Sequence, residues 1–370
     1  MLRQLAALTR RVPAAGPRAL ALAVYSDAMG EQFEARESGV EGVACVDDAA
    51  RASALLYRLW AATGNDALKQ WANGLMDFVL WMHAGDGLWF NFILDWDGAR
   101  NVDGPTSAPG INFWQARAAY AVAEAELALY QDRGRDVLTQ ALDAAGSASP
   151  PSDVRAIHCL TLLAVLQRAP DPRLTRLLGA WCDELAGCQR DGVLMNSPDE
   201  RGRPHLWGHV QEAVLADASV LLRRRELLTV AMTSADAVFG ELIESGFDVP
   251  HTHSYEVQSA VFVLDRLAAI TGQERFADMS YKARHWFDRR NPADAAIYDR
   301  VTGRVSDGLD DRRVSDSSGA EANITAGLAL MSDPGVLSLA RGWAPGSVAT
   351  SGHESPAEAA FAADQTRSAR

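Results

Sequence analysis

The fold of this chain is decided by a stretch that reads LLYRLWAATGNDALKQWANGLMDFVLWM, residues 55–82. An apolar run with helical spacing ends at a Thr-Gly turn, a polar residue or two follow, and a second run carries aromatic residues. The stretch VLDRLAAITGQERFADMSYKARHWFDRR, residues 263–290, has the same plan. Gly64 and Gly272 suit the left-handed backbone position that ends a helix. Each stretch therefore predicts an αα-hairpin.

Weaker copies of this plan recur along the chain, which is the signature of a repeat architecture. The first helices of six hairpins are expected to begin near Asp47, Asn112, Asp153, His209, Ser254 and Ser318. Extended segments are predicted only between hairpins, in GLWFNFILDW at 87–96 and AIYDRVTGRVSDGL at 296–309. Six hairpins bury every apolar face if they close into a ring. We therefore predict an all-α (α/α)6 toroid with short extended segments in its loops; an open solenoid or an irregular bundle is the alternative.

Composition bounds the domain organisation and the partners. The chain has 370 residues, of which 48% are hydrophobic, and its 35 basic and 48 acidic side chains give a net charge of −13. An acidic surface repels phosphate backbones and anionic lipids, so we expect neither nucleic acid nor membrane as a partner. We predict N-terminal helices over 1–40 that pack on the toroid, the toroid over 41–343, and a disordered tail, rich in Ala, Ser, Gly and Pro, over 344–370.

The cysteines and the N-terminus suggest a reducing compartment. The four cysteines contain no CxxC pair and do not form a disulfide framework in a chain of this length. No apolar run approaches the roughly 20 residues of a transmembrane helix. Arginines interrupt any signal-peptide core near the start of the chain. We expect a soluble, cytoplasmic protein.

Polar and aromatic residues collect at the predicted starts of the first helices. In a closed ring these starts gather around one mouth of the central cavity. Asp and Ser also cap helices, so capping is an alternative role for Asp47 and Ser317. Capping does not explain the histidines and tryptophans found at the same places. Flat aromatic faces beside carboxylates suit sugar rings, although packing at a hairpin base is the alternative for each tryptophan.

Other kinds of chemistry lack a motif. His209, Glu212, His251, His253 and Glu256 could approach one another, but the chain has no HExxH or other diagnostic zinc spacing. The Asp-rich stretch 298–311 lacks the alternation of an EF-hand loop. The chain has no dinucleotide fingerprint, no P-loop, no GxSxG and no Cys/His pairing typical of a nucleophile. We expect no metal and no cofactor.

Two motifs resemble a known family. GVACVDDAARA, residues 42–52, is similar to the GYCTDDNARAL opening of a bacterial family of (α/α)6 domains. Many members are described as glycosyltransferase-like or glycoside-hydrolase-like because they are fused to or lie beside sugar-handling enzymes. IYDRVTGRVSDGLDDRRVSDSSGAEANITAGLAL, residues 297–330, resembles the family's LYD..TGGC.DGL....VN.N.GAES....LLAL. The resemblance spans about residues 40–335. The matching residues are Cys45, Asp47, Asp48, Arg51, Asn91, Phe92, Glu256, Asp299, Asp307, Gly308, Gly319, Ala320 and Glu321.

The chain also departs from the family pattern. Ala49, Ser315 and Ser317 stand where the family has Asn, and INFWQARAAYAV at 111–122 stands where the family has an acidic EDS.GRALWAL. The lost acids near Asn112 remove a candidate catalytic carboxylate or sugar ligand. The resemblance thus implies the fold and a carbohydrate ligand, and leaves open a shifted substrate or a loss of activity.

The predicted function is an intracellular glycoside hydrolase that acts on an oligosaccharide with paired carboxylates. Asp48 and Glu256 are the predicted catalytic pair, because they begin different inner helices and could face each other across the cavity. Adjacent helical residues diverge by about 100°, so at most one of Asp47 and Asp48 is expected to face the cavity. The predicted substrate-binding residues are Asp47, Arg51, Trp89, Asn91, Trp114, Trp207, His209, Glu212, His253, Tyr255 and Glu321.

Three alternatives stay open at this point. One is a sugar epimerase or polysaccharide lyase on the same ring, in which His253 or Tyr255 exchanges a proton at carbon. Another is a non-catalytic toroid that binds a glycan. The third is a helical-repeat adaptor, which predicts a hydrophobic groove. The resemblance suggests a glycosyltransferase of the same pathway as a protein partner.

Overall fold

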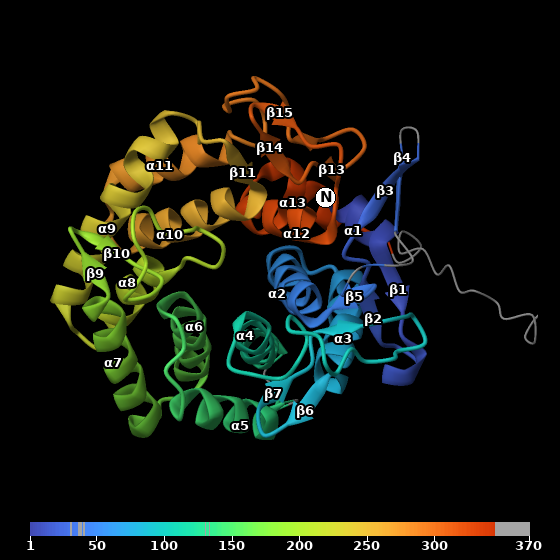
Figure 1. Ribbon diagram of the computed structural model, residues 1–370, viewed down its shortest axis with the longest axis horizontal. Coiled ribbons are helices and arrows are strands. Elements are labelled where there is room, and N and C mark those ends of the chain that lie inside the picture. The colour runs from blue at the N-terminus through green and yellow to red at the C-terminus, as the bar shows by residue number, and fades with distance from the viewer. Residues whose placement is uncertain (30–31, 36–38, 40, 130, 133, 345–370) are drawn as a thin grey trace, which may run out of the picture.

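The chain folds into a ring of six αα-hairpins (Figure 1). The computed structural model describes residues 1–29, 32–35, 39, 41–129, 131–132 and 134–344. The inner helices are α2 (Val46–Thr63), α4 (Phe113–Leu129), α6 (Ser152–Arg168), α8 (Gln211–Leu221), α10 (Ser254–Thr271) and α12 (Ala320–Ala329). The outer helices that follow them are α3 (Asp66–Trp81), α5 (Arg135–Gly146), α7 (Pro172–Gly187), α9 (Arg225–Glu244), α11 (Glu274–Arg284) and α13 (Pro334–Arg341).

The ring is closed, because its last inner helix contacts its first. Each inner helix packs against the next, from α2 through α4, α6, α8 and α10 to α12, and α12 packs against α2. An open solenoid would leave these two helices apart. The predicted toroid is confirmed, and the predicted starts of its first helices lie within two residues of the observed ones.

Local signals end the helices where the sequence predicts. Gly64 follows α2 with φ 71° and Gly272 follows α10 with φ 65°, both in the left-handed region. The Asn65 side chain then accepts a hydrogen bond from the Ala67 N–H and caps α3. Short hairpin turns of this kind bring each outer helix back along its inner partner.

Inner and outer helices differ in how much of their surface is covered. In α6 the consecutive residues 156–160 are all buried, because neighbours cover this inner helix on every side. In α11 the buried residues are Phe276, Ser280 and Ala283, which share one face at helical spacing. The core therefore lies between the two layers of helices and between adjacent inner helices.

The residues before the ring form one helix and two β-hairpins. Their elements are α1 (Leu2–Leu8), β1 (Thr9–Arg11), a 3-10 turn (Pro13–Ala15), β2 (Leu20–Leu22), β3 (Ser26–Met29) and β4 (Gln32–Ala35). α1 packs on α12, and β2 packs on α3. The prediction of helices over 1–40 is correct for α1 and wrong for the hairpins. Pro13, Gly16 and Pro17 stop the helical pattern, and the residues after them turn back to pair with β1.

The loops before and between the helices of the ring contain short strands, which pair with one another. They are β5 (Ala44–Cys45), β6 (His83–Gly85), β7 (Leu88–Trp89), β8 (Phe92–Ile93), β9 (Gln189–Arg190), β10 (Val193–Leu194), β11 (His251–His253), β12 (Tyr298–Asp299), β13 (Arg304–Val305), β14 (Gly308–Asp310) and β15 (Arg313–Val314). The extended segments predicted within 87–96 and 296–309 are confirmed by β7, β8, β12 and β13. β5 pairs with β8 directly before α2, and β11 pairs with β14 directly before α10. These pairings fix the starts of two inner helices at the mouth.

The tail predicted over 344–370 lies, apart from Ala344, outside the described residues. Among the helices that the structure describes, none has the length and apolar character to cross a membrane.

Gly327 lets the last inner helix approach the first, so a larger residue there should strain the closure. A Cβ at this position of α12 would lie 2.6 Å from Leu55 Cδ2 on α2. We expect Gly327→Leu to lower the free energy of unfolding by roughly 1–3 kcal/mol through overpacking, measured by urea denaturation. A Cβ at Gly240 on outer helix α9 meets nothing within 4 Å, so Gly240→Leu is the matched control. Equal losses in both variants would contradict a tight α2–α12 contact.

Candidate active site

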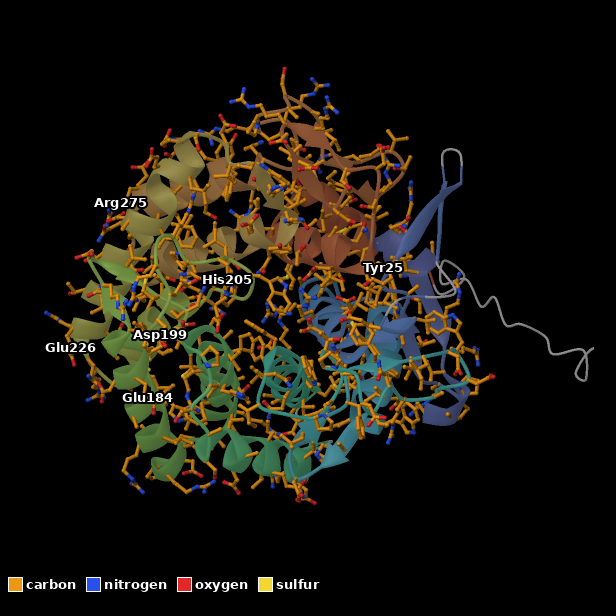
Figure 2. The ribbon with its side chains drawn as sticks, viewed as in Figure 1. Tyr25, Glu184, Asp199, His205, Glu226 and Arg275 are labelled. Atoms are coloured by element: carbon orange, nitrogen blue, oxygen red, sulfur yellow. The ribbon has the colours of Figure 1, made fainter. Side chains whose placement is uncertain are left out.

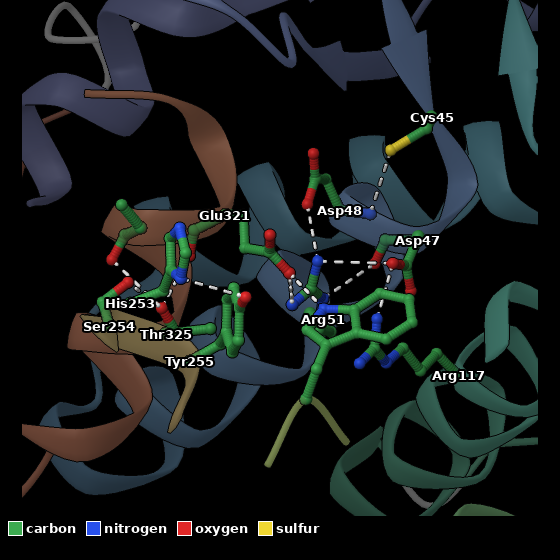
Figure 3. Close-up of polar contacts among 12 residues, drawn as sticks. Cys45, Asp47, Asp48, Arg51, Arg117, His253, Ser254, Tyr255, Glu321 and Thr325 are labelled. Atoms are coloured by element: carbon green, nitrogen blue, oxygen red, sulfur yellow. Dashed lines mark hydrogen bonds and ion pairs between the residues drawn. The ribbon is translucent and has the colours of Figure 1, made fainter. Parts of the chain in front are cut away.

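Arg51 lies at the centre of the candidate site and binds three carboxylates (Figure 3). Its Nη2 donates to Asp48 Oδ1 at 2.8 Å and to Asp47 Oδ2 at 3.4 Å, and its Nη1 donates to Glu321 Oε1 at 2.8 Å. Asp47 and Asp48 precede Arg51 by one helical turn of α2, which places all three side chains together. Glu321 comes from the first turn of α12. The guanidinium therefore joins the first and last inner helices of the ring.

A second arginine and a tryptophan complete this group. Arg117 of α4 donates from Nη1 to Asp47 Oδ2 at 2.6 Å. The Trp207 ring lies 4.4 Å from the Arg117 guanidinium carbon and 4.3 Å from the Phe113 ring. Its Nε1–H donates to Glu321 Oε1 at 2.8 Å. Trp207 thus connects α4 to α12 across the start of α2.

We call Asp47, Asp48, Arg51, Arg117 and Glu321 the carboxylate–arginine cluster. Three carboxylates and two guanidiniums would leave a net charge of −1 if all were ionised. Burial raises the pKa of Asp48 to about 7, and the charges of Glu321 and Asp47 add to this effect against Arg51. Burial acts on Asp47 too, but Arg117 and Arg51 outweigh it and hold its pKa below the ordinary value. A proton on Asp48 makes the cluster neutral, so two adjacent aspartates hold different protonation states.

The start of α2 is held by other residues of the matched motifs. The Asp48 N–H donates to Cys45 Sγ at 3.4 Å, and the Asp47 N–H donates to Asn91 Oδ1 at 3.2 Å. Cys45 is therefore the capping residue, and the carboxylate of Asp47 is free to bind arginine. Burial holds the pKa of the Cys45 thiol well above its ordinary value, so this thiol is a structural group and not a nucleophile.

Two cavities meet near this cluster. The mouth cavity, about 1250 Å³ including space open to solvent, is lined by polar side chains such as His253, Asp307, Ser317 and Glu321. The inner chamber, about 690 Å³ on the same measure, lies between the middle turns of the inner helices and is bordered by Arg51 and Arg117. Tyr255 lines both cavities.

His253 and Tyr255 form a stacked pair at the mouth. Their ring centroids lie 4.9 Å apart at an interplanar angle of 6°. The Tyr255 hydroxyl and His253 Nδ1 are 3.1 Å apart (Figure 3). Burial raises the pKa of Tyr255 to about 12, with further contributions from Glu256 and Glu321. Both predicted residues therefore lie where a ligand in the mouth cavity would touch them.

Asp48 and Glu256, the predicted catalytic pair, have different hydrogen-bond partners. The Asp48 carboxylate binds Arg51, while the Glu256 carboxylate accepts a hydrogen bond from the His253 N–H at 2.8 Å and closes a capping box at the start of α10. Glu256 does not line the mouth cavity or the inner chamber. Both Asp47 and Asp48 bind Arg51, and neither is among the residues that line the mouth cavity or the inner chamber. This agrees with the expectation that at most one of them faces the cavity.

The structure assigns packing roles to several residues that were predicted to bind a sugar. Trp89, His209 and Glu212 are 0% exposed, so a sugar cannot touch them in this structure. Trp89 Nε1–H donates to the Val79 carbonyl at 2.8 Å, and Trp114 Nε1–H donates to the Trp89 carbonyl at 3.0 Å. These indoles secure the first hairpin to α4, which is the packing alternative considered for each tryptophan.

His209 and Glu212 act on the site only through the loop before α8. His209 Nδ1 lies 2.8 Å from Asn196 Oδ1, and His209 Nε2 lies 3.1 Å from Glu212 Oε1. Asn196 Nδ2 in turn donates to the His205 carbonyl at 2.9 Å. Figure 2 shows His205 toward the inside of the ring. This buried network holds the loop that carries Trp207 to the cluster.

Sequence reasoning missed Arg117 and the aromatic contact of Phe113. Both lie in the stretch INFWQARAAYAV, where the family pattern EDS.GRALWAL retains an arginine at the position of Arg117. That retained arginine is the signal that could have identified it. Phe113 stands in place of a family acid, and its ring supports Trp207.

Within the described ranges, no group of three or more His, Cys, Asp or Glu side chains is arranged to hold a metal ion. His209 is buried beside Glu212, while His253 lies at the mouth beside Tyr255. These two histidines, which the sequence suggested as possible metal ligands, thus have other partners.

Solved structures match most of this ring at low sequence identity. A sugar epimerase from a ruminal bacterium has a TM-score of 0.65 and 10% identity, over 90% of this chain and 96% of that one. A D-mannose isomerase has a TM-score of 0.64 and 12% identity, over 87% and 92%. A family 76 glycoside hydrolase from a bovine Bacteroides thetaiotaomicron strain has a TM-score of 0.60 and 10% identity, over 85% and 73%.

These comparisons establish the fold class of the chain, but they do not identify a relative by sequence. The matched structures are (α/α)6 toroids, so the chain has the expected six-hairpin, glycosidase-like fold. No protein-family model and no curated protein sequence matches it.

The raised pKa of Asp48 predicts a distinct effect of pH on stability. The native state keeps the Asp48 proton up to about pH 7, whereas the unfolded chain loses it near 3.8. Between these values the native state binds more protons, so this group lowers the free energy of unfolding as pH rises from about 4 to about 7. The contribution is on the order of 4 kcal/mol. Urea unfolding should show wild type losing stability relative to Asp48→Asn across this window.

Asp47→Asn makes the same chemical change at the neighbouring aspartate, whose pKa is held below its ordinary value. It leaves Arg117 buried without its carboxylate and should cost roughly 3–5 kcal/mol at neutral pH. If wild type and Asp48→Asn show parallel stability profiles between pH 4 and 7, Asp48 does not hold a proton in the native state.

Proposed function

We propose that the protein is a glycoside hydrolase that binds a sugar in the mouth cavity, against Glu321. The observation that supports this most is the presence of two protonation states in one cluster. Burial raises the pKa of Asp48 to about 7, while Arg117 and Arg51 keep Asp47 ionised. Hydrolysis of a glycoside needs an acid for the leaving oxygen and a carboxylate that activates water or attacks C1.

Glu321 is the carboxylate of the cluster that can touch a bound sugar. Its side chain is 35% exposed and lines the mouth cavity. Arg51 binds Glu321 through Nη1 and Asp48 through Nη2, so the acid and the carboxylate flank a single guanidinium. We therefore propose Asp48 and Glu321 as the catalytic pair in place of Asp48 and Glu256.

The proposed reaction consumes one glycoside and one water. The Asp48 proton passes to the glycosidic oxygen as the C1–O bond breaks, and the leaving group departs as an alcohol. Water adds to C1, Glu321 takes its proton, and exchange with solvent restores the acid form of Asp48. Asp48 is 3% exposed, so Arg51 has to move away from it when the sugar binds.

The lining of the mouth cavity supports a sugar as the ligand class. Tyr25, His253 and Tyr255 offer ring faces, and Ser317 and Glu321 offer groups that can bind hydroxyls. The structural neighbours named above as a sugar epimerase, a mannose isomerase and a glycoside hydrolase share the fold in which this lining occurs.

Sugar epimerisation or isomerisation is a second candidate, favoured by the His253–Tyr255 pair. The pair lines the mouth beside Glu321, and the His253 side chain is 45% exposed. An imidazole in this position could remove a proton from a sugar carbon and return it to another face or another carbon. The glycosidic bond would then stay intact.

Substitution of Glu321 tests the proposed glycoside hydrolysis. We expect Glu321→Gln to reduce glycoside turnover roughly 10²–10⁴-fold, because it removes the charge while keeping an oxygen for Trp207. Turnover by wild type should fall above pH 7 as Asp48 loses its proton. The measurement is the release of reducing sugar from a panel of oligosaccharides and 4-nitrophenyl glycosides.

Glu256→Gln tests the alternative pair, because its amide oxygen can still accept from the His253 N–H. We expect turnover close to wild type; a loss as large as that of Glu321→Gln would restore Asp48 and Glu256 as the pair. Uptake of solvent deuterium at a sugar carbon without bond cleavage would favour the epimerase. A glycan that stabilises wild type against heat without any turnover would make the protein a binding toroid.

A further inference from the structure

The inner chamber differs in chemistry from the mouth cavity. Side chains from five inner helices give it apolar walls. These residues are Ala54, Ala121, Ile157, Leu160, Phe262 and Leu328. The mouth also has apolar side chains in its lining, from Val24, Leu309 and Ala322, but it adds hydroxyl, imidazole and carboxylate groups. A ligand that reached both cavities would need one polar end and one apolar end.

The arginines that border the chamber are already bound to carboxylates. Arg58 donates from Nε to Glu124 Oε2 at 2.7 Å and from Nη2 to the Tyr120 hydroxyl at 2.6 Å. Arg51 and Arg117 belong to the carboxylate–arginine cluster. The other polar groups of the lining are the Gln258 amide and the hydroxyls of Tyr120 and Tyr255. A hydroxyl-rich group that entered would still exchange most of its hydrogen bonds to water for apolar walls, which is unfavourable. An apolar group would instead gain from leaving water.

The two cavities meet where the reaction is proposed to occur. Tyr255 lines both of them, and Arg51 of the chamber wall binds Glu321 of the mouth wall. A sugar held against Glu321 would direct its glycosidic oxygen toward Arg51 and Asp48. The group on the far side of that oxygen would then enter the chamber.

We propose that the inner chamber binds an apolar alkyl or aryl leaving group, so that the substrate is a glycoside with an apolar aglycone. The assignment of this group as a leaving group rests on the proposed hydrolysis. The binding of an apolar group by the chamber does not depend on turnover and can be measured separately.

Binding of a homologous series tests the chamber directly. The probes are methyl, butyl, hexyl and octyl β-D-glucopyranosides below their micelle concentrations, with the n-alkanols of the same lengths as probes without a sugar. Calorimetric affinity should rise about fourfold per methylene, the equivalent of about 0.8 kcal/mol, until the chamber is filled. The headgroup is constant within each series, so the slope reports the chamber alone.

A chamber-filling variant shows where the alkyl chain binds. Leu328 of α12 is partly exposed in the chamber, so Leu328→Trp should remove the dependence on chain length, while Leu328→Met should keep it. Leu94→Trp makes the same change at a residue that is 52% exposed on the surface and should behave as wild type. If circular dichroism shows that Leu328→Trp does not fold, Phe262→Trp on the neighbouring helix α10 takes its place.

The outcomes separate this proposal from the proposed hydrolysis. A flat series in wild type, or a slope that survives Leu328→Trp, would overturn the chamber as an apolar site. A slope that Leu328→Trp abolishes supports it. If that slope is found but no glycoside is cleaved, the chamber remains an apolar site and the hydrolysis fails.

Discussion

The arrangement of the site depends on one guanidinium that binds three carboxylates. Arg51 takes Asp47 and Asp48 from its own helix and Glu321 from the far end of the ring. A buried arginine needs such partners, because an unpaired charge in the interior is costly. Three ionised carboxylates carry more negative charge than one guanidinium can balance, and Arg117 adds only one further positive charge. The remaining imbalance falls on the most buried group of the three, Asp48, whose pKa rises to about 7.

Ring closure and site chemistry are therefore linked. α12 packs against α2, and the same contact places Glu321 beside Arg51. Trp207 then bridges from Arg117 to Glu321, held in place by the buried network around His209 and Asn196. The acid, the exposed carboxylate and the stacked aromatic pair lie around one mouth because the inner helices all begin there. The fold thus gathers residues that are up to 270 positions apart in the sequence.

The sequence predicts those features that arise from local patterns. Helical spacing and the Thr-Gly turns at Gly64 and Gly272 identify the hairpins, and the quoted motifs identify most of the cluster. The N-terminal hairpins were not predicted, because Pro13, Gly16 and Pro17 indicate only that the helix ends. The pairing of Thr9 with Leu22 across this segment is a contact between separated residues that local patterns do not specify. Arg117 binds Asp47 from 70 residues away, so its role follows only from the ring. Glu256 could have been recognised as a capping residue, because it stands three residues after the helix-capping His253.

The central claim is that Asp48 keeps its proton up to about pH 7 inside this cluster. It is tested most directly by a ¹³C NMR titration of the full chain with ¹³Cγ-labelled aspartate, in which Asp48→Asn identifies the resonance of Asp48. The account predicts one aspartate carboxyl that titrates near pH 7 and is missing from the Asp48→Asn spectrum, while the pKa of Asp47 lies below the ordinary aspartate value. An Asp48 resonance that titrates below pH 5 would contradict the account, because Arg51 would then hold three ionised carboxylates and no acid.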